Sequence, residues 1–229
     1  MIAKLEGVSK EYQLGDQQII ALDKTDMELK LGELLLIIGP SGSGKTTLLS
    51  LLGCVLYPTT GKLWVDDKLV NGLNQKELAK LRLNTIGFVF QNFNLLAPLT
   101  AEQNVMMPME LKGMSKKDAQ RKVDEALQLV GMRDRRHNLP KELSGGQQQR
   151  IAIARALVTA PKLILCDEPT AALDKDSMHV VMNELRSLAD NGIALAVVTH
   201  DPRLMPYAHR VVEVNNGIVT ESSNHSKHS

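Results

Sequence analysis

The stretch Leu34-Leu-Leu-Ile-Ile-Gly-Pro-Ser-Gly-Ser-Gly-Lys-Thr46 decides the fold of this chain. Its first five residues, Leu34 to Ile38, are all apolar, which is typical of a strand that is buried on both faces. Gly39 to Thr46 then has the pattern of a phosphate-binding loop, and Thr46 to Leu52 has the pattern of a helix. Glycines let backbone N–H groups turn inward around phosphate oxygens, and the helix N-terminus adds positive potential. This order of strand, loop and helix predicts an α/β fold with a nucleotide site.

Two side chains of this loop are suited to the chemistry of a nucleoside triphosphate. Lys45 is expected to reach the β- and γ-phosphates, and the hydroxyl of Thr46 is expected to hold Mg²⁺. The predicted nucleotide contacts of the loop are Gly39, Pro40, Ser41, Gly42, Ser43, Gly44, Lys45, Thr46 and Thr47.

A second motif, Leu163-Ile-Leu-Cys-Asp-Glu168, is an apolar strand that ends in two acids. Ligands of open α/β sheets bind at the carboxyl ends of the strands, where these acids are expected. Asp167 suits a water-mediated contact to Mg²⁺, and Glu168 suits a general base that positions the attacking water. An acidic pair after a strand is also compatible with a helix cap, but the upstream phosphate loop favours a catalytic role.

A third motif, Leu143-Ser-Gly-Gly-Gln147, is continued by Gln148-Gln149-Arg150 and precedes the helical run Ile151 to Leu157. Ser144 can cap that helix, and the two glycines would expose its first amides to an anion. A helix cap alone would explain the start Ser-Gly but not the whole string.

With these three motifs in this order, the sequence resembles the ATP-binding-cassette ATPases over essentially its whole length. The resemblance implies an α/β P-loop core with a small antiparallel β-subdomain and an inserted helical subdomain. It implies hydrolysis of ATP to ADP and phosphate, with ATP and Mg²⁺ as cofactors. It also implies a head-to-tail dimer, in which one subunit covers the ATP of the other with Ser144, Gly145, Gly146 and Gln147.

The resemblance carries four further positions over to this chain. Tyr12 matches the aromatic residue that stacks on adenine, and His200 matches the histidine that contacts the γ-phosphate. Gln91 matches the glutamine that contacts Mg²⁺ and water, and Asp174 lies in the loop that crosses the dimer interface. The implied catalytic residues are Glu168, His200, Gln91 and Lys45, and the implied metal contacts are Thr46, Gln91 and Asp167.

Strand and helix patterns alternate at both ends of the chain, around a middle, Ala101 to Ala160, that is helical. We therefore expect one domain over residues 1–220, with a helical subdomain at about 92–158. A polar tail over 221–229 is expected to be flexible, with His225 and His228 as adventitious metal ligands. The predicted strands are Leu34–Ile38, Lys62–Val70, Ile86–Gln91, Lys162–Cys166, Ile193–Thr199 and Arg210–Val214, and the predicted helices outside the middle are Thr46–Leu52 and Ser177–Ala189. Within the middle, Lys116–Val130 has a clear amphipathic pattern.

Composition limits the partners and the compartment. Lys and Arg number 27 against 26 Asp and Glu, and aromatic residues make up 3%, so neither a basic surface nor a stacking platform predicts nucleic-acid binding. Cys54 and Cys166 lie in apolar runs and fit a reducing compartment. The N-terminus does not resemble a signal peptide, and no run approaches the roughly 18 apolar residues of a membrane span. We expect a soluble cytoplasmic chain that lies on the inner face of the cell membrane through a permease.

The residues in and around these motifs resemble those of the lipoprotein-release and macrolide-export group, and those of the glycolipid-exporter ATPases within it. This similarity rests on Phe93 to Thr100, on Leu143 to Arg150 and on Glu168-Pro-Thr-Ala-Ala-Leu-Asp174. It implies an exporter with integral membrane permease subunits and allows a periplasmic adaptor as a further partner.

Two other functions share this cassette. A DNA-repair or chromosome ATPase would carry a long coiled coil, but the segment between Gln91 and Leu143 is short and has no sustained heptads. A cell-division regulator that signals without transport stays open.

Four of the ten methionines lie between Phe93 and Met114, a segment that follows Gln91 directly. Methionine adapts to irregular apolar surfaces, so the segment could form the docking groove for the permease. The same residues could instead fill the core between the helical subdomain and the sheet.

Overall fold

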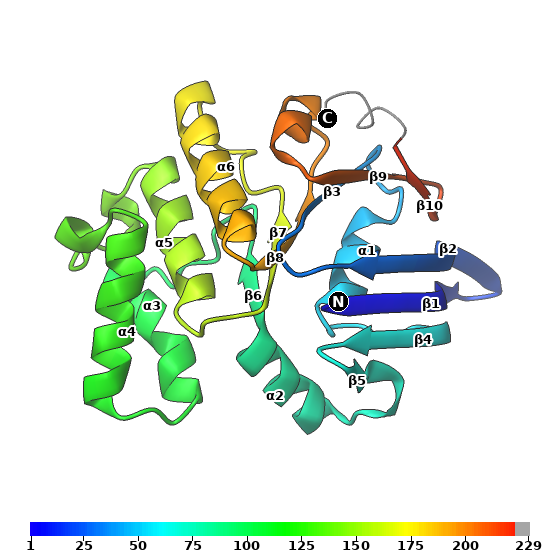
Figure 1. Cartoon of the computed structure of the whole chain (residues 1–229), viewed down its shortest axis with the longest axis horizontal. Coiled ribbons are helices and arrows are strands. Elements are labelled where there is room, and N and C mark those ends of the chain that lie inside the picture. Colours follow the sequence, from blue (N-terminus) through cyan, green and yellow to red (C-terminus); the bar gives the residue numbers. More distant parts are fainter. Residues whose placement is uncertain (223–229) are drawn as a thin grey trace.

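The computed structural model describes residues 1–222, and within them the strands form two sheets (Figure 1). The central sheet has the order β10-β9-β3-β8-β7-β6, in which β10 alone runs antiparallel to its neighbour. The strands of this sheet are β3 (Leu34–Ile38), β6 (Ile86–Val89), β7 (Leu163–Asp167), β8 (Ala194–Val198), β9 (Arg210–Asn215) and β10 (Ile218–Glu221). A second, antiparallel sheet has the order β2-β1-β4-β5, with β1 (Ala3–Leu14), β2 (Gln17–Leu29), β4 (Thr60–Val65) and β5 (Lys68–Leu69).

The central sheet separates two hydrophobic cores. Leu34 and Leu36 of β3 face one core, and Leu35 and Ile37 face the other, as the two-residue period of a strand requires. Helix α1 (Lys45–Leu52) and the antiparallel sheet enclose the second core. The helices of the first core are α3 (Ala101–Leu111), α4 (Lys116–Leu129), α5 (Gly145–Leu157) and α6 (Lys175–Asp190). The expected α/β core with an antiparallel β-subdomain and an inserted helical region is therefore confirmed.

Several boundaries differ from the sequence expectation for local reasons. The predicted strand Lys62–Val70 is a hairpin, because Asp66 and Asp67 both have left-handed backbones, with φ of 49° and 58°. Strand β6 ends at Val89, two residues before the predicted end at Gln91. Strands β1 and β2 were not located from the pattern, since their many charged residues face solvent along one side.

Helix α2 (Gln75–Thr85) was also not predicted, although a capping box marks its start. The side chain of Asn74 accepts from the N–H of Glu77 at 3.0 Å, and the Glu77 carboxylate accepts from the N–H of Asn74 at 2.8 Å. Short 3₁₀ turns complete the described chain at Val70–Gly72, Arg133–Arg135, Pro140–Glu142 and Pro202–Tyr207.

The C-terminal boundary falls slightly later than residue 220, the expected end of the domain. Glu221 ends β10, and the N–H of Ser222 donates to the carbonyl of Val211 at 3.0 Å. The rest of the expected tail, with His225 and His228, lies outside the described residues.

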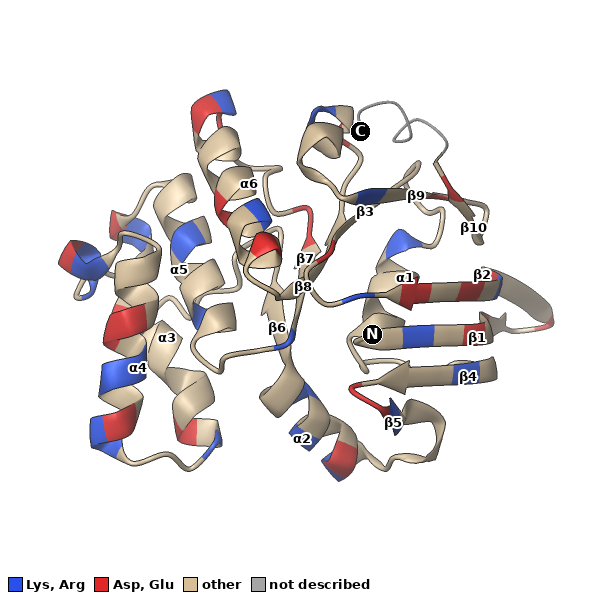
Figure 2. Ribbon diagram, viewed as in Figure 1, with Lys and Arg blue, Asp and Glu red and all other residues tan. Residues whose placement is uncertain are grey.

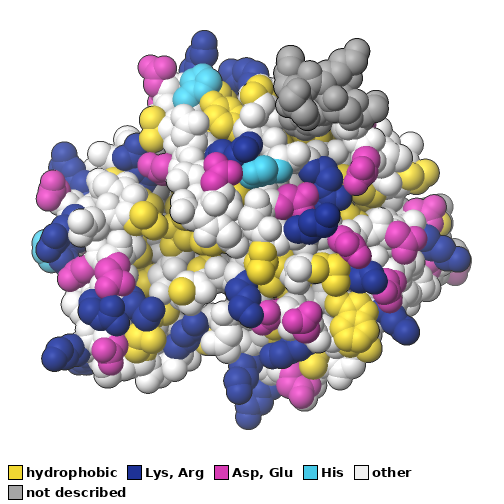
Figure 3. Space-filling model, viewed as in Figure 1, with side chains coloured by type: hydrophobic (Ala, Val, Ile, Leu, Met, Phe, Trp, Pro, Cys, Tyr) yellow, Lys and Arg dark blue, Asp and Glu magenta, His cyan; other side chains and the backbone are white. Residues whose placement is uncertain are grey.

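The amphipathic helix predicted for Lys116–Val130 is present as α4, and acidic and basic residues line its outer side (Figure 2). On the face of the molecule seen in Figure 3, basic and acidic side chains are interspersed, in keeping with a net charge of +1. None of the helices within residues 1–222 is long and apolar enough to cross a membrane.

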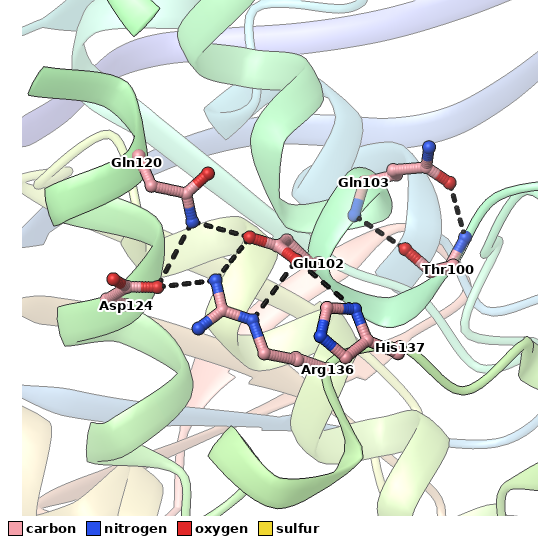
Figure 4. A network of polar contacts seen from close by, with 7 residues as sticks. All are labelled: Thr100, Glu102, Gln103, Gln120, Asp124, Arg136 and His137. Atoms are coloured by element: carbon pink, nitrogen blue, oxygen red, sulfur yellow. Dashed lines mark hydrogen bonds and ion pairs between the residues drawn. The ribbon is translucent and has the colours of Figure 1, made fainter. Parts of the chain in front are cut away.

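A partly buried ion-pair network ties α3 and α4 to the segment that precedes α5 (Figure 4). The guanidinium of Arg136 donates from Nη2 and Nε to the Glu102 carboxylate, and from Nη2 to Asp124 at 2.7 Å. Gln120 donates to both acids, and His137 Nδ1 lies 3.8 Å from Glu102. The side chains of Glu102 and Arg136 are only 16% and 22% exposed, so loss of one partner leaves a charge that is poorly solvated.

We expect Arg136→Met to lower the free energy of unfolding by about 1.5–3 kcal/mol, the scale of hydrogen bonds to charged groups. Urea unfolding would measure this change. Arg121→Met is the matched control, because its ion pair with Glu125 at 2.8 Å is exposed and should be worth at most about 0.5 kcal/mol. Equal losses in the two variants would contradict a special role of the network.

The same comparison should depend on pH. Hydrogen bonds from Arg136 hold the pKa of the Glu102 carboxyl below its ordinary value of 4.5, against the opposing effect of burial. The ionised form is thus favoured in the folded state, so its contribution is present above pH 4.5 and is lost as pH falls through the lowered pKa. The difference in free energy of unfolding between wild type and Arg136→Met should therefore become smaller in that acid range.

Candidate functional site

The predicted phosphate loop, residues 39–44, joins β3 to α1 and is confined on two sides. A Cβ atom on Gly39 would lie 2.1 Å from the carbonyl oxygen of Val214, and one on Gly44 would lie 2.3 Å from that of Ala21. Both glycines also have positive φ, 149° and 111°, so a larger residue at either position would meet backbone and strain it. The loop is therefore held between β2 and the β9–β10 turn.

Lys45 begins α1, and its ammonium lies within the loop. The side chain is buried, and Nζ donates to the carbonyls of Gly39 at 2.8 Å and Pro40 at 2.7 Å. The hydroxyl of Ser43 is buried beside it and has no hydrogen-bond partner among the described residues. Gly44, at the N-cap, offers no side-chain acceptor to the first amides of the helix. A positive charge, free amides and an orphaned hydroxyl suit a bound phosphate chain.

Hard oxygen donors suitable for Mg²⁺ lie next to this loop. Thr46 and Asp167 line the same cavity of about 300 Å³, at the carboxyl end of β7. Burial raises the pKa of the Asp167 carboxyl, the nearby Glu168 raises it further, and Lys45 opposes both. Within residues 1–222 no group of three His, Cys, Asp or Glu side chains could hold a metal by itself. Mg²⁺ at Thr46 and Asp167 would thus need phosphate oxygens or water as further ligands.

Glu168 is the most tightly oriented acid of the site. Its backbone is left-handed, with φ of 48°, and its N–H donates to the carbonyl of Val198 at 2.9 Å. Thr199 Oγ1 lies 3.0 Å from Oε2 and donates to it, while the N–H of His200 donates to Oε1 at 3.0 Å. His200 Nδ1 lies 2.7 Å from the same Oε1. A left-handed backbone is unfavourable for glutamate, and its presence here fits a residue whose carboxylate must point in one direction.

Thr199 was not among the residues predicted from the sequence. It follows β8, whose parallel pairing with β7 puts Thr199 beside Glu168, and this contact depends on strand order rather than on any motif. His200 differs from Glu168 in exposure, with side chains that are 71% and 13% exposed. The imidazole can therefore reach a ligand in solvent while it holds the partly buried acid.

Gln91 is exposed and lies at the same edge of the sheet. Val89 of β6 pairs with Cys166 of β7, so Gln91, two residues beyond Val89, corresponds to Glu168, two residues beyond Cys166. Directly after Gln91 the chain turns sharply, with left-handed backbones at Phe93 and Asn94.

The predicted anion-binding segment, Ser144 to Gln147, forms the first turn of α5. Ser144 Oγ accepts from the N–H of Gln147 at 3.3 Å, and Gln147 Oε1 accepts from the N–H of Ser144 at 3.0 Å, which is a capping box. A Cβ atom on Gly145 would lie 3.4 Å from the carbonyl oxygen of Ala172, and one on Gly146 would lie 3.2 Å from Ser177 Oγ. The segment therefore packs against the start of α6.

Asp174 has a clear structural part in this arrangement. As the N-cap of α6, it accepts from the N–H of Ser177 at 2.9 Å and from its hydroxyl at 2.7 Å. The hydrogen bonds from the Ser177 backbone and side chain lower the pKa of the Asp174 carboxyl.

The phosphate loop and the Ser144–Gln147 segment are not brought together within one chain. The helix of the first, α1, packs in one core, and the helix of the second, α5, packs in the core on the other face of the central sheet (Figure 1). The segment lines its own pocket of about 320 Å³ with Asp176, Ser177 and Arg150. The two halves of the expected ATP site thus belong to helices on different faces of the central sheet.

Tyr12 lies on the β1–β2 hairpin, opposite Ile19, and its ring is 41% exposed. The Lys10 ammonium lies 5.2 Å from the ring centroid. The same hairpin contacts the phosphate loop where Ala21 meets Gly44. The ring is therefore available to a flat apolar ligand group on the hairpin that flanks the loop.

Fold and site together define a P-loop nucleotide-hydrolysing domain. The ABC transporter family model matches residues 22–171, and the chain belongs to this family of ATPases. It is 43% identical to YknY, an ABC transporter ATP-binding protein of Bacillus subtilis, with 96% of each chain covered. It is also 43% identical to the macrolide export ATP-binding/permease protein MacB of Photorhabdus laumondii, over 97% of this chain but only 34% of that protein.

Solved structures agree with this assignment. The ATP-binding cassette MJ0796, in a dimeric post-hydrolysis state bound to ADP and Pi, has a TM-score of 0.88 and 40% identity. The similarity covers 96% of this chain and 98% of that one. This chain is therefore an ATP-binding ATPase of the cassette type.

We expect Tyr12→Ala to weaken ATP binding by about 1–2 kcal/mol, the scale of an aromatic ring stacked on a base. Tyr12→Phe keeps the ring and should bind ATP almost as wild type does. Titration of each variant with ATP in a calorimeter measures both affinities. Equal damage from Phe and Ala would show that the hydroxyl matters and that the ring does not stack.

Proposed function

We propose that this chain is the motor of a membrane exporter related to the macrolide-export type, and that it works as a head-to-tail pair. The observation that carries the pairing is that α1, which follows the phosphate loop, and α5, which begins with the Ser144–Gln147 segment, pack on opposite faces of the central sheet. In such a pair, each segment covers the ATP that the partner's loop holds. The dimeric ATP-binding cassette with ADP and Pi supports this arrangement.

Bound ATP would supply the phosphoryl group, and Thr46, Asp167 and Gln91 are the residues that we propose would hold Mg²⁺, whose charge would offset repulsion at the phosphates. The residues of the chain then position the attacking water and stabilise the charge on the phosphates. Lys45 stabilises negative charge at the β- and γ-phosphates. Glu168 accepts a hydrogen bond, and then a proton, from the attacking water, and Thr199 and His200 keep its carboxylate aligned.

The exporter assignment rests on relatives in which the same cassette is joined to a permease. MacB proteins are named as macrolide export ATP-binding/permease proteins, and this chain matches about a third of their length. We propose that separate permease subunits provide the remaining functions here, with a periplasmic adaptor as a further partner. On this proposal the chain lies at the cytoplasmic face of the membrane, and export is favoured over a purely signalling role.

The four methionines of residues 93–114 (Met106, Met107, Met109 and Met114) are not the surface that we propose for permease docking. Met109 is fully buried, and Met106 and Met114 pack against the same hydrophobic core, which α3 shares with α4 and α5. The neighbouring groove, about 370 Å³, is the better candidate for a permease contact. It lies between α2 and α3 and is lined by residues that include Leu83, Phe88, Phe90, Asn94, Pro108 and Leu111. It begins next to Gln91, so a helix bound there would be close to the ATP site.

Glu168→Gln should lower ATP turnover by at least about 100-fold, because the amide cannot take a proton from the attacking water. ATP affinity should survive, since Lys45 and the loop amides supply it. The unhydrolysed ATP should also prolong the closed pair, which size-exclusion chromatography with MgATP would detect. Glu125→Gln, an exposed acid on α4, is the control and should retain wild-type turnover. A Glu168→Gln protein with near wild-type turnover would refute the assigned role.

Cysteines at Leu96 and Leu111, which are 44% and 72% exposed, should crosslink to the purified permease. Leu129→Cys, 63% exposed on α4, is the control and should not react with it. The native cysteines can stay, because both are fully buried and burial raises the pKa of Cys54 to about 12. Docking lies elsewhere if neither site crosslinks while the permease still stimulates ATP turnover.

A further inference from the structure

Arg155 lies near the end of α5 and reaches the turn that follows Gln91. Its Nη2 donates to the carbonyl of Phe93 at 2.7 Å, and its Nη1 donates to the carbonyl of Asn94 at 2.5 Å. One guanidinium therefore holds two successive peptide groups. Because side chains on a helix lean toward its N-terminus, this contact lies closer to the Ser144–Gln147 end than the position of Arg155 suggests.

The turn that Arg155 holds is conformationally unfavourable. Phe93 and Asn94 have φ of 57° and 47°, and a left-handed backbone at two successive non-glycine residues is uncommon. Within the turn, the N–H of Phe93 donates to Phe90 O at 3.0 Å and the N–H of Asn94 donates to Asn92 O at 2.5 Å. The carbonyls of Phe93 and Asn94 point the other way, and the guanidinium satisfies both.

The turn also contacts the opposite end of the same helix. A Cβ atom on Gly145 would lie 3.9 Å from Phe93 Cζ and 3.4 Å from the carbonyl oxygen of Ala172. Phe93 is therefore bonded to α5 through its carbonyl at Arg155, and its ring lies near Gly145. A shift of this turn would therefore change how the Phe93 ring packs at the first turn of α5.

Arg155 has no acidic partner that would account for its position. Burial lowers the pKa of its guanidinium, although the group stays charged, and in the described part of the chain no carboxylate pairs with it. A cation that loses water without a counter-charge is costly unless its hydrogen bonds are well made. The two carbonyls of the turn accept those hydrogen bonds, so the turn accounts for the position of the arginine.

Arg155 and Asn94 also line the groove between α2 and α3, together with Phe90 and Leu111. Anything that binds in this groove contacts the guanidinium and the turn at once. The Arg155 guanidinium therefore contacts three features at once: the groove, the turn after Gln91, and α5, to which it belongs.

We infer that Arg155 is a positioning residue that couples occupancy of the groove to the Ser144–Gln147 segment. It locks the Phe93–Asn94 turn to α5, so that a permease helix that displaces the turn also moves the segment that covers the ATP of the other copy. The coupling step rests on the proposed permease docking, whereas the lock itself is a property of the isolated chain.

Hydrogen exchange on the isolated chain tests the lock. Arg155→Met keeps the length of the side chain but removes both donors, and should raise amide exchange about tenfold at residues 92–95 and 144–147. Arg155→Lys can bond one carbonyl and should give an intermediate change, which also serves if the Met variant folds poorly. Lys112→Met is the matched control. Lys112 is likewise partly buried and donates to a backbone carbonyl, that of Thr159 at 3.1 Å, but does not touch the turn. Unchanged exchange at both segments in Arg155→Met would overturn the inference.

The assembled complex with its permease tests the coupling. The ratio of permease-stimulated to unstimulated ATP turnover should fall about tenfold in Arg155→Met, with partial recovery in Arg155→Lys and none of this loss in Lys112→Met. ATP affinity should not change in any of the three. A preserved ratio in Arg155→Met refutes the coupling. A wild-type chain that its permease neither binds nor stimulates refutes the proposed docking and the coupling with it, while hydrogen exchange still decides the lock.

Discussion

Parallel pairing of β3, β8, β7 and β6 brings the carboxyl ends of four strands to one edge of the central sheet, and the chemistry of the chain depends on this pairing. The phosphate loop follows β3, Asp167 ends β7, and Thr199 follows β8. Gln91 lies just beyond β6. The four motifs are far apart in the sequence, and only the strand order brings them together. A slip of one residue in the register of β7 against β8 would move the Glu168 carboxylate away from Thr199 and His200.

The sequence predicted the parts of this site that depend on local rules. Glycine spacing identified the loop, and a run of apolar residues before two acids identified β7, because both signals are read within a few residues. The roles assigned from family resemblance remain predictions. Contacts set by tertiary structure were missed, such as the bond of Thr199 to Glu168 and the reach of Arg155 to the turn at Phe93. Strands β1 and β2 were missed because bulges after Leu5, Val8 and Lys10 interrupt the alternation of buried and exposed residues that would have marked them.

The methionines show where composition misleads. Their side chains suit both a flexible binding surface and an irregular interior, and only burial distinguishes the two. Met109 is in the core, whereas the accessible apolar residues nearby are leucines, Leu96 and Leu111. The ion pairs of Arg136 with Glu102 and Asp124 stabilise the same helical region. They fix α3 and α4 to the segment before α5.

The two half-sites, the phosphate loop and the Ser144–Gln147 segment, belong to helices on opposite faces of the central sheet, and this has a consequence for symmetry. If a second copy is related by a two-fold axis, one contact geometry satisfies both half-sites of both chains at once. Such an isologous pair is closed, because no half-site is left to recruit a third copy. The assembly then stops at two chains and two equivalent nucleotides. Hydrolysis at either nucleotide breaks that equivalence. The two sites of the pair then hold different nucleotides, and the symmetric state returns only when the products have been replaced by ATP.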